Sequence, residues 1–361
     1  MVTSTTGVFV TADTEALFHF HFSRCGLLNN VIYTNRDEFV SSHHSCKVVC
    51  LQLPYPIEAA FDDDLQYFAN NADSVLVLVS ELHNNTVSIL QRNDRKNIIY
   101  FVCGELNTPL AHSPVHKFYD WLTTTVHFYR NVRPSTLDIL TPYSPKPLMF
   151  DVLLGRKKIH RKFAYDYIES HNLMDKNIVT YLDSVNHCNL ANTTSDKWIW
   201  EKDGLEIGQN IEWTVERFPY YGHSMSISQV IPLTIYNQTA YSIVAETNWE
   251  NYYSFYTEKT VKPIIGRRLF VMLAGQFHLR NLRNVGFKTF DTIIDETYDT
   301  TEDNTARFGQ AMDQVKYLCN QPQEEILAKI KSIVDHNFTV MMSTNWYNVY
   351  FKPAFISYFN Q

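Results

Sequence analysis

Glycine and cysteine are both scarce in this sequence. Only 11 of its 361 residues are glycine, which excludes collagen-like and glycine-rich fibrous proteins. The six cysteines show no zinc-ligand spacing, and the nearest pair, Cys46 and Cys50, forms a CxxxC pattern with no histidine pair at finger distance. The N-terminus also lacks the basic and apolar regions of a secretion signal. These absences predict free thiols and a cytoplasmic protein.

Long apolar runs and an excess of positive charge are missing as well. No stretch approaches the about 18 uninterrupted apolar residues of a membrane-spanning helix, so we expect no membrane partner. The formal net charge is −7, which excludes global attraction to nucleic acid or to an anionic membrane. Recognition of a phosphate would therefore need a local basic patch. What the chain does contain is 45% hydrophobic residues, enough for the cores of two domains.

The first half of the chain alternates short apolar runs with helical patterns. This alternation predicts a mostly parallel sheet covered by helices on both faces. The expected strands are Val48–Leu53, Ser74–Val79 and Asn97–Gly104, and the expected helices are Ile57–Asn70, Thr86–Gln91 and His116–Tyr129.

A stretch with four prolines, Arg133–Leu148, then predicts a linker without regular structure. After it the alternation restarts, so we predict an α/β protein with two Rossmann-like domains that face a cleft. The expected divisions are 1–140, 148–340 and a C-terminal tail, 341–361, that packs back on the first domain. The strands expected in the second domain are Leu148–Leu154, Asn177–Leu182, Ala240–Glu246 and Leu269–Ala274, and the helices are His160–Ser170, Glu258–Gly266 and His278–Val285.

Charge is distributed unevenly in the second domain. Residues 259–290 contain seven Lys or Arg and no acid, whereas residues 291–303 contain six acids and no base. Thr257 is a plausible N-cap of the helix that follows it, and a helix N-terminus with free N–H groups suits an anionic ligand. Lys259 in the first turn opposes the helix dipole and needs a compensating anion, such as a phosphate. The alternative is a solvated basic face paired with the acidic segment.

An apolar strand ends at Glu246, Thr247 and Asn248 follow, and after a loop Thr257-Glu258-Lys259 opens a helix. This arrangement resembles the donor-binding segment of nucleotide-sugar glycosyltransferases with the GT-B fold, most closely the α-1,3-fucosyltransferase family. The resemblance implies a nucleotide-sugar donor, a ribose contact for Glu258, a diphosphate contact for Lys259, and no metal or other cofactor. It makes 1–140 the acceptor domain and 148–340 the donor domain. The donor-binding candidates are Arg156, Arg161, Glu246, Thr257, Glu258, Lys259 and Lys262.

The runs TEKTVKPII, RLFVMLAG, LRNLRNVGFKTF and DETYD also resemble phage and marine-virus proteins of glycosyltransferase type. That resemblance covers about residues 148–303. It implies a bacteriophage enzyme of DNA modification, working in the host cytoplasm on a hydroxymethylated base in viral DNA. A hydroxyl on a glycan or a lipid carrier is the other acceptor, and a non-catalytic nucleotide-binding protein or a structural viral protein is the alternative to an enzyme.

An inverting transferase needs a base that takes the proton of the acceptor hydroxyl. The candidates are Asp13 and Glu105, which follow strands of the first domain. A carboxylate in such a loop more often faces solvent or caps a helix, and a retaining mechanism would need neither residue. His19 and His21 alternate as in a strand and share one face, but no partner carboxylate accompanies them. The acidic run 62–64 is typical of a solvated helix face. We therefore expect no metal site.

Overall fold

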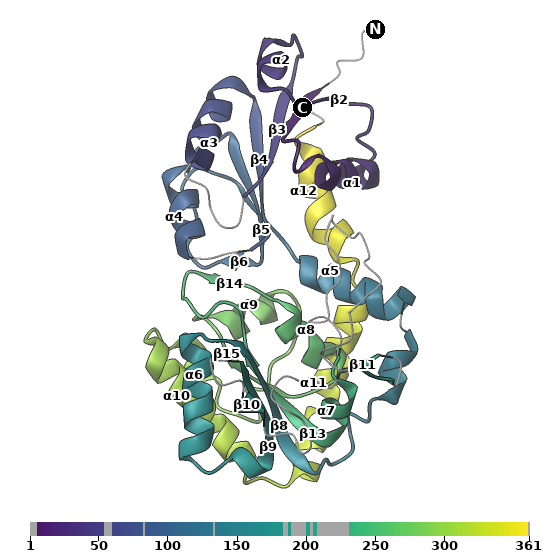
Figure 1. Ribbon diagram of the computed structural model, residues 1–361, viewed down its shortest axis with the longest axis vertical. Helices are drawn as coiled ribbons and strands as arrows, with labels where there is room; N and C mark the ends of the chain where they lie inside the picture. The colour runs from purple at the N-terminus through teal and green to yellow at the C-terminus, as the bar shows by residue number, and fades with distance from the viewer. Residues whose placement is uncertain are drawn as a thin grey trace. The chain divides into compact units, whose positions relative to one another are not determined.

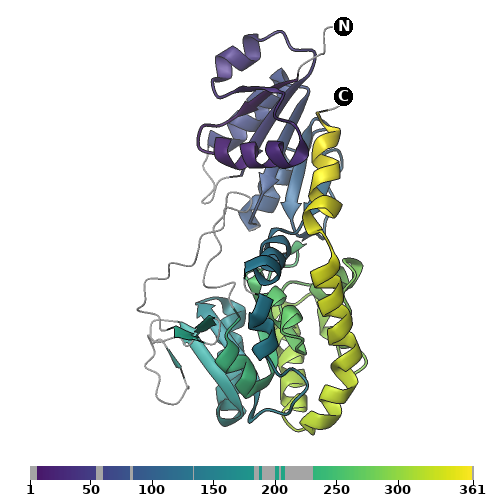
Figure 2. The ribbon, with the colours of Figure 1, turned by 90° about the vertical axis from the view of Figure 1, so that its right-hand side faces the viewer.

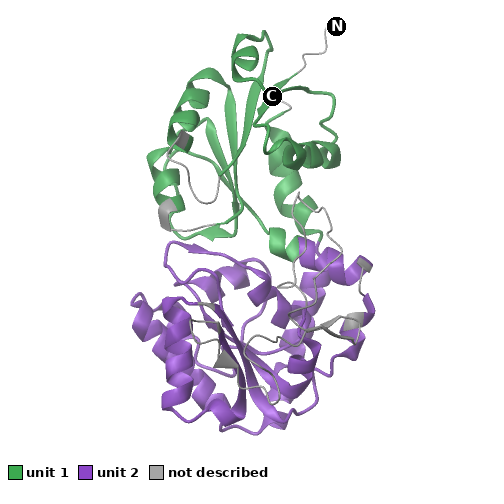
Figure 3. Ribbon diagram, viewed as in Figure 1, with its two compact units in different colours: residues 1–123, 218–224, 345–361 green, residues 124–217, 225–344 purple. Residues whose placement is uncertain are grey.

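The computed structural model describes residues 6–53, 60–81, 84–132, 134–182, 187–188, 200–202, 205–207 and 231–359. They form two compact units (Figure 3), and each is described by itself. Among the described residues, unit 1 contains those up to Thr123 and those from Asn345 onward, and unit 2 contains those between. The division falls within helix α5 (Asp120–His127) and not in Arg133–Leu148. Part of that stretch, Pro134–Ile139, is a 3₁₀ helix, although no regular structure was expected there.

Unit 1 is built on a six-stranded parallel sheet in the order β2-β1-β3-β4-β5-β7 (Figure 1). β4 and β5 bury all of their residues, as expected of parallel strands covered on both faces. The chain runs from β1 outward to β2 and then returns to the other side as β3, so the direction of winding changes between β1 and β3. The strands are β1 (Gly7–Val10), β2 (Val31–Tyr33), β3 (Lys47–Gln52), β4 (Ser74–Val79), β5 (Ile98–Cys103) and β7 (Val115–Phe118).

Helices cover both faces of this sheet. Figure 1 shows α3 and α4 on one face and α1 and α12 on the other. The helices are α1 (Glu15–Cys25), α2 (Arg36–Ser41), α3 (Ala60–Asn71), α4 (Asn84–Arg92), α5 and α12 (Lys352–Ser357). Two expectations are wrong here. His19 and His21 lie in α1 and not in a strand. Residues 116–118, expected to begin a helix, belong to the edge strand β7 beside β5.

The C-terminal segment contributes to the core of unit 1. The π-helical turn Tyr347–Phe351 precedes α12, and the ring of Phe351 is fully buried. Its centroid lies 4.5 Å from that of His21 in α1, 5.2 Å from that of Phe101 in β5 and 5.6 Å from that of Phe118 in β7. These contacts join the two ends of the chain around one sheet, and Figure 2 shows α12 against the strands of unit 1.

Unit 2 contains a five-stranded sheet in the order β10-β9-β8-β13-β15. All neighbouring strands are parallel except β10, which is antiparallel to β9. From β8 the chain winds outward to β9, and from β13 it winds the other way to β15, so the change of direction lies between β8 and β13. The strands are β8 (Leu148–Arg156), β9 (Asn177–Leu182), β10 (His187–Cys188), β13 (Thr239–Ala245) and β15 (Phe270–Leu273).

Helices cover both faces of this sheet. α6 (Ile159–Ser170) and α10 (Asn304–Leu318) pack together on one face, and α8 (Glu258–Ile265) and α11 (Gln323–Ser343) pack on the other (Figure 1). None of the helices in the described part of the chain is both long and apolar enough to cross a membrane. The smaller elements are β6 (Glu105–Leu106), β11 (Trp200–Lys202), β12 (Leu205–Ile207), β14 (Tyr253–Ser254), α7 (Leu233–Gln238), α9 (His278–Asn284), and single turns at Phe128–Val132, Met174–Lys176 and Thr297–Thr300.

A buried ion pair joins the strands of unit 2. The guanidinium of Arg268 donates to the carboxylate of Asp151 at 2.8 Å, to the hydroxyl of Ser242 at 3.0 Å and to the carbonyl of Thr239 at 2.7 Å. Burial raises the pKa of Asp151, while Arg268 acts in the opposite direction. A buried ion pair is tolerated only where further hydrogen bonds offset the cost of its desolvation. The bonds to Ser242 and Thr239 meet this requirement, and the network links Arg268 to β8 and β13.

Candidate functional site

The candidate site lies where β8 and β13 end. In an open parallel sheet, ligands bind beyond the carboxyl ends of the strands, at the point where the winding changes direction. In unit 2 this point is flanked by Lys157 and Lys158, which precede α6, and by residues 246–248, which follow β13. The loop after 248 leads to α8, whose first residue is Glu258. The Thr-Glu-Lys segment therefore starts a helix at this edge of the sheet, as the sequence predicts.

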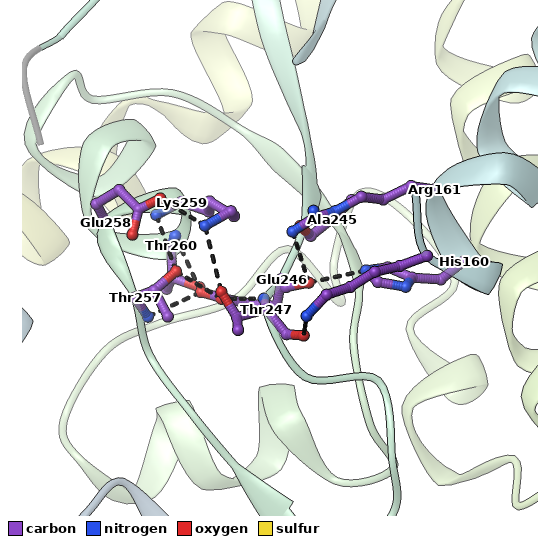
Figure 4. A network of polar contacts seen from close by, with 10 residues as sticks. His160, Arg161, Ala245, Glu246, Thr247, Thr257, Glu258, Lys259 and Thr260 are labelled. Carbon is purple, nitrogen blue, oxygen red and sulfur yellow. Dashed lines mark hydrogen bonds and ion pairs between the residues drawn. The ribbon is translucent and has the colours of Figure 1, made fainter. Parts of the chain in front are cut away.

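The carboxylate of Glu246 lies at the centre of a polar network (Figure 4). One of its oxygens, Oε1, accepts hydrogen bonds from the backbone N–H of Thr257 at 3.0 Å, from the hydroxyl of Thr260 at 2.6 Å and from the N–H of Thr260 at 3.3 Å. The other, Oε2, accepts from the N–H of Thr247 at 2.8 Å and from the hydroxyl of Thr257 at 2.7 Å. Glu246 is fully buried. Its hydrogen bonds to Thr257 and Thr260 therefore link the end of β13 to the start of α8 within the protein interior.

The first turn of α8 is consequently capped by the chain itself. Thr257 is the N-cap, and its hydroxyl oxygen also accepts from the N–H of Lys259 at 3.3 Å. The expectation that this helix start offers free N–H groups to an anionic ligand is wrong for the amides of Thr257, Lys259 and Thr260. Glu246 and the capping hydroxyl already occupy these three amides, so they are not available to an anion.

Three charged side chains lie on the first two turns of α8. The ammonium of Lys259 is 2.5 Å from the carboxylate of Glu258 and 3.3 Å from the hydroxyl of Thr247. The anion that compensates this first-turn lysine is therefore Glu258. Burial acts to raise the pKa of Glu258, but the cations of Lys259 and Lys262 outweigh it and the pKa is lowered. Burial, reinforced by Lys259, lowers the pKa of Lys262 to about 8.

Residues at the start of α6 face the same strand end. The Nε2 atom of His160 lies 2.8 Å from the carbonyl oxygen of Glu246, and Arg161 donates to the same carbonyl at 3.5 Å. Burial and the neighbouring Arg161 lower the pKa of His160 to about 3, so its ring is neutral near pH 7 and Nε2–H is the donor. Burial also lowers the pKa of Arg161. Lys158 donates to the carbonyl of Thr247 at 2.6 Å and lies over the ring of Trp249.

The predicted donor-site residues therefore divide by exposure. Lys259 keeps 25% of its side chain exposed. Glu258 is close to it and largely buried, at 8%. Arg156 is the last residue of β8, and its side chain lies outside what the structure describes. Arg161, Glu246, Thr257 and Lys262 are buried. The cluster holds four cations, Lys158, Arg161, Lys259 and Lys262, against two carboxylates, Glu246 and Glu258, which leaves a local excess of two positive charges (4 − 2).

The two candidate bases follow different strands of unit 1. Asp13 is exposed and comes after β1, where the winding of that sheet changes direction. Glu105 comes after β5 and accepts from the hydroxyl of Tyr119 at 3.0 Å, with the ammonium of Lys117 at 3.3 Å. Because β3 and β4 separate β1 from β5, the sheet does not bring these carboxylates to one strand end.

Sequence reasoning missed three residues with distinctive environments. Asp120 follows β7 at the start of α5, and burial raises its pKa to about 7; its Oδ1 atom is inaccessible, although the residue as a whole is only half-buried. Because the sequence predicts one helix over His116–Tyr129, it does not indicate that Asp120 follows a strand. Lys158 and His160 belong to residues 156–162, a basic run after β8 from which the sequence predicts only Arg156 and Arg161 as donor-binding residues. Among the residues that the structure describes, no group of three or more His, Cys, Asp or Glu is arranged to hold a metal ion.

No family model matches this chain, and no curated protein matches it. Among solved structures it is similar to an α1,3-fucosyltransferase. That match, to "Crystal Structure of alpha1,3-Fucosyltransferase", covers 100% of this chain and 90% of the other, with 10% sequence identity and a TM-score of 0.41. A likeness this distant assigns no activity to the chain, so the function has to be argued from the site.

Proposed function

We propose that this protein is a glycosyltransferase that takes a sugar from a nucleotide-sugar and transfers it to an acceptor hydroxyl. The observation that supports the proposal most is the cationic cluster at the strand ends of unit 2. It lies where ligands of such sheets bind, and its excess of two positive charges complements a diphosphate. The expected Thr-Glu-Lys helix start occupies the same place.

Lys259 is the residue proposed to contact the donor diphosphate. It is the partly exposed cation of α8, and its ammonium is a compact charge suited to phosphate oxygens. As the bond between sugar and phosphate breaks, negative charge grows on the leaving diphosphate, and a cation fixed beside it lowers the barrier. Glu258, which is paired with Lys259, is proposed to accept a hydrogen bond from a ribose hydroxyl. Arg156 is proposed as a second phosphate contact from the end of β8.

Unit 1 is proposed to hold the acceptor. Asp13 is the preferred base because it is exposed at the change of winding of that sheet, whereas Glu105 already has two partners. The acceptor is a hydroxymethylated base in DNA or a hydroxyl of a glycan or lipid carrier. These acceptors differ in how their affinity depends on salt, because neutralising DNA phosphates releases counterions.

The first experiment is a thermal-shift screen against UDP-, GDP-, ADP- and CMP-linked sugars. A ligand at 100 times its dissociation constant stabilises the folded protein by about 2.7 kcal/mol. The sugar nucleotide that stabilises the protein is then supplied with each acceptor class, and the product is followed by mass spectrometry. The proposal predicts stabilisation and transfer. Stabilisation without transfer to either class would indicate a nucleotide-binding protein, and no stabilisation by any sugar nucleotide would contradict the proposal.

A further inference from the structure

The carboxylate of Glu246 has no acceptor capacity left for a ligand. A carboxylate offers about four lone-pair sites, and this one already receives five hydrogen bonds, three of them from backbone N–H groups. The residue has no exposed surface. A ribose hydroxyl or any other ligand group could reach it only by displacing part of the start of α8. In this arrangement the carboxylate therefore cannot contact a bound nucleotide-sugar directly.

The five donors come from two separate segments. The N–H of Thr247 belongs to the loop that leaves β13. Thr257 and Thr260 belong to the start of α8, 11 and 14 residues after Glu246 in the sequence. A negative charge at a helix N-terminus is also stabilised by the helix dipole. Glu246 consequently fixes both ends of the intervening loop against each other and sets where α8 begins.

The backbone of Glu246 adds a third element. Its carbonyl oxygen accepts from His160 and Arg161 of α6, on the other side of the strand end (Figure 4). Because His160 is neutral near pH 7, its donation does not change over the ordinary working range of pH. Residue 246 thus joins β13, α6 and α8 at the change of winding.

We propose that Glu246 is a positioning residue, which fixes the first turn of α8 so that the ammonium of Lys259 is held at the place where a donor phosphate binds. The geometry supports this directly, since the ammonium of Lys259 also bonds to the hydroxyl of Thr247, whose own N–H is held by Glu246. The inference rests on the proposed function for its catalytic consequence. Its structural consequence, an ordered start of α8, holds whatever the ligand is.

The first test is hydrogen exchange on the protein without nucleotide, comparing wild type with Glu246→Gln. The amide keeps the shape of the side chain but points N–H groups at some of the five N–H and hydroxyl donors. Loss of a buried hydrogen bond costs enough to speed exchange of the amides of Thr247, Thr257 and Thr260 by roughly 10- to 100-fold. Thr260→Val removes the hydroxyl that donates to Glu246 from α8, and it should also speed exchange of these amides, by a smaller factor. Thr339→Val is the matched control, since that hydroxyl is exposed on α11 and bonds only a carbonyl of its own helix.

The second test is a double-mutant cycle read in kcat/KM and in the affinity of the sugar nucleotide found in the screen. A residue that acts through Lys259 loses its effect once Lys259 is removed. Glu246→Gln should therefore lower both quantities in the wild-type background and change them by less than about threefold in Lys259→Ala. A direct ligand contact would give additive losses and unchanged exchange at α8, and that result would overturn the inference.

The two proposals fail in different ways. If no sugar nucleotide binds, the proposed function fails while the exchange measurement still tests the role of Glu246. If wild type transfers sugar but exchange at Thr257 and Thr260 is the same in Glu246→Gln and wild type, the positioning role is wrong and the glycosyltransferase stands. If Glu246→Gln does not fold, Thr260→Val carries both measurements, and wild-type exchange and activity in that variant contradict the inference.

Discussion

Removing the ammonium of Lys259 should separate the catalytic from the structural role of the first turn of α8. In Lys259→Ala, the proposed stabilisation of the leaving diphosphate is lost. Removal of one such group typically costs about 2.7–4 kcal/mol of transition-state stabilisation, a 10²- to 10³-fold fall in kcat. We expect a fall of that size.

The same substitution should also destabilise unit 2. Sequence reasoning predicts almost no loss, because a first-turn lysine opposes the helix dipole. In the structure, however, Lys259 lies 2.5 Å from the carboxylate of Glu258, which is only 8% exposed. Leaving a largely buried acceptor without this partner costs about 1–3 kcal/mol, and the nearby Lys262 keeps the loss at the lower end of that range.

The assay combines initial rates with urea denaturation of wild type, Lys259→Ala and Lys331→Ala. Lys331 is the matched control, because it forms an exposed pair with Asp335 on α11, 3.0 Å apart. Such pairs contribute about 0–1 kcal/mol, so the control should keep both activity and stability. Wild-type kinetics in Lys259→Ala would refute the phosphate role. Unchanged stability would show that the Glu258 pair contributes nothing.

Three further outcomes follow from buried groups. Phe351→Ala should lower the free energy of unfolding of unit 1 by about 3–5 kcal/mol, measured by urea denaturation, because it leaves a cavity among rings of α1, β5 and β7. Arg268→Ala should cost unit 2 about 3–5 kcal/mol in the same assay, since Asp151 is left as a buried charge without its partner. Asp120 has a pKa of about 7 in the folded protein against 3.8 for the free side chain, so the folded state binds the extra proton and stability falls as pH rises between these values. Asp120→Asn should therefore gain stability over wild type from pH 4 to pH 7 and no more above it, and a pH-independent difference would show that this carboxyl is not desolvated.

Local signals were sufficient for β4 and for the start of α8. β4 was predicted with its observed bounds because apolar residues fill it between polar neighbours. The N-cap Thr257 was recognisable because a threonine precedes a helical pattern with an acid in its first turn. Both features depend on residues that are close in sequence, and no distant contact is needed to recognise them.

The errors arise where distant contacts decide the local structure. In α1, the alternation of histidine and phenylalanine suggested a strand, but Leu17, Phe18, His21, Phe22 and Cys25 form the buried face of a helix. Residues 115–118 form a strand because β5 offers an open edge to pair with. The aromatic residues that follow favoured a helix over the whole of His116–Tyr129. No signal in the local sequence indicates that β5 has an open edge for pairing.

The roles of Glu246 and Glu258 show why a site is harder to predict than a fold. Each is an acid next to a threonine, and each lies at a boundary between a regular element and a loop. Glu246 receives N–H and hydroxyl donors, which are neutral and fixed by the backbone of α8 and by the loop after β13. Glu258 is paired instead with the partly exposed ammonium of Lys259, a cation of the kind that binds carboxylate and phosphate oxygens alike. The donors that surround a carboxylate therefore distinguish a group that builds the site from one that can meet a ligand, and those donors are set by the fold.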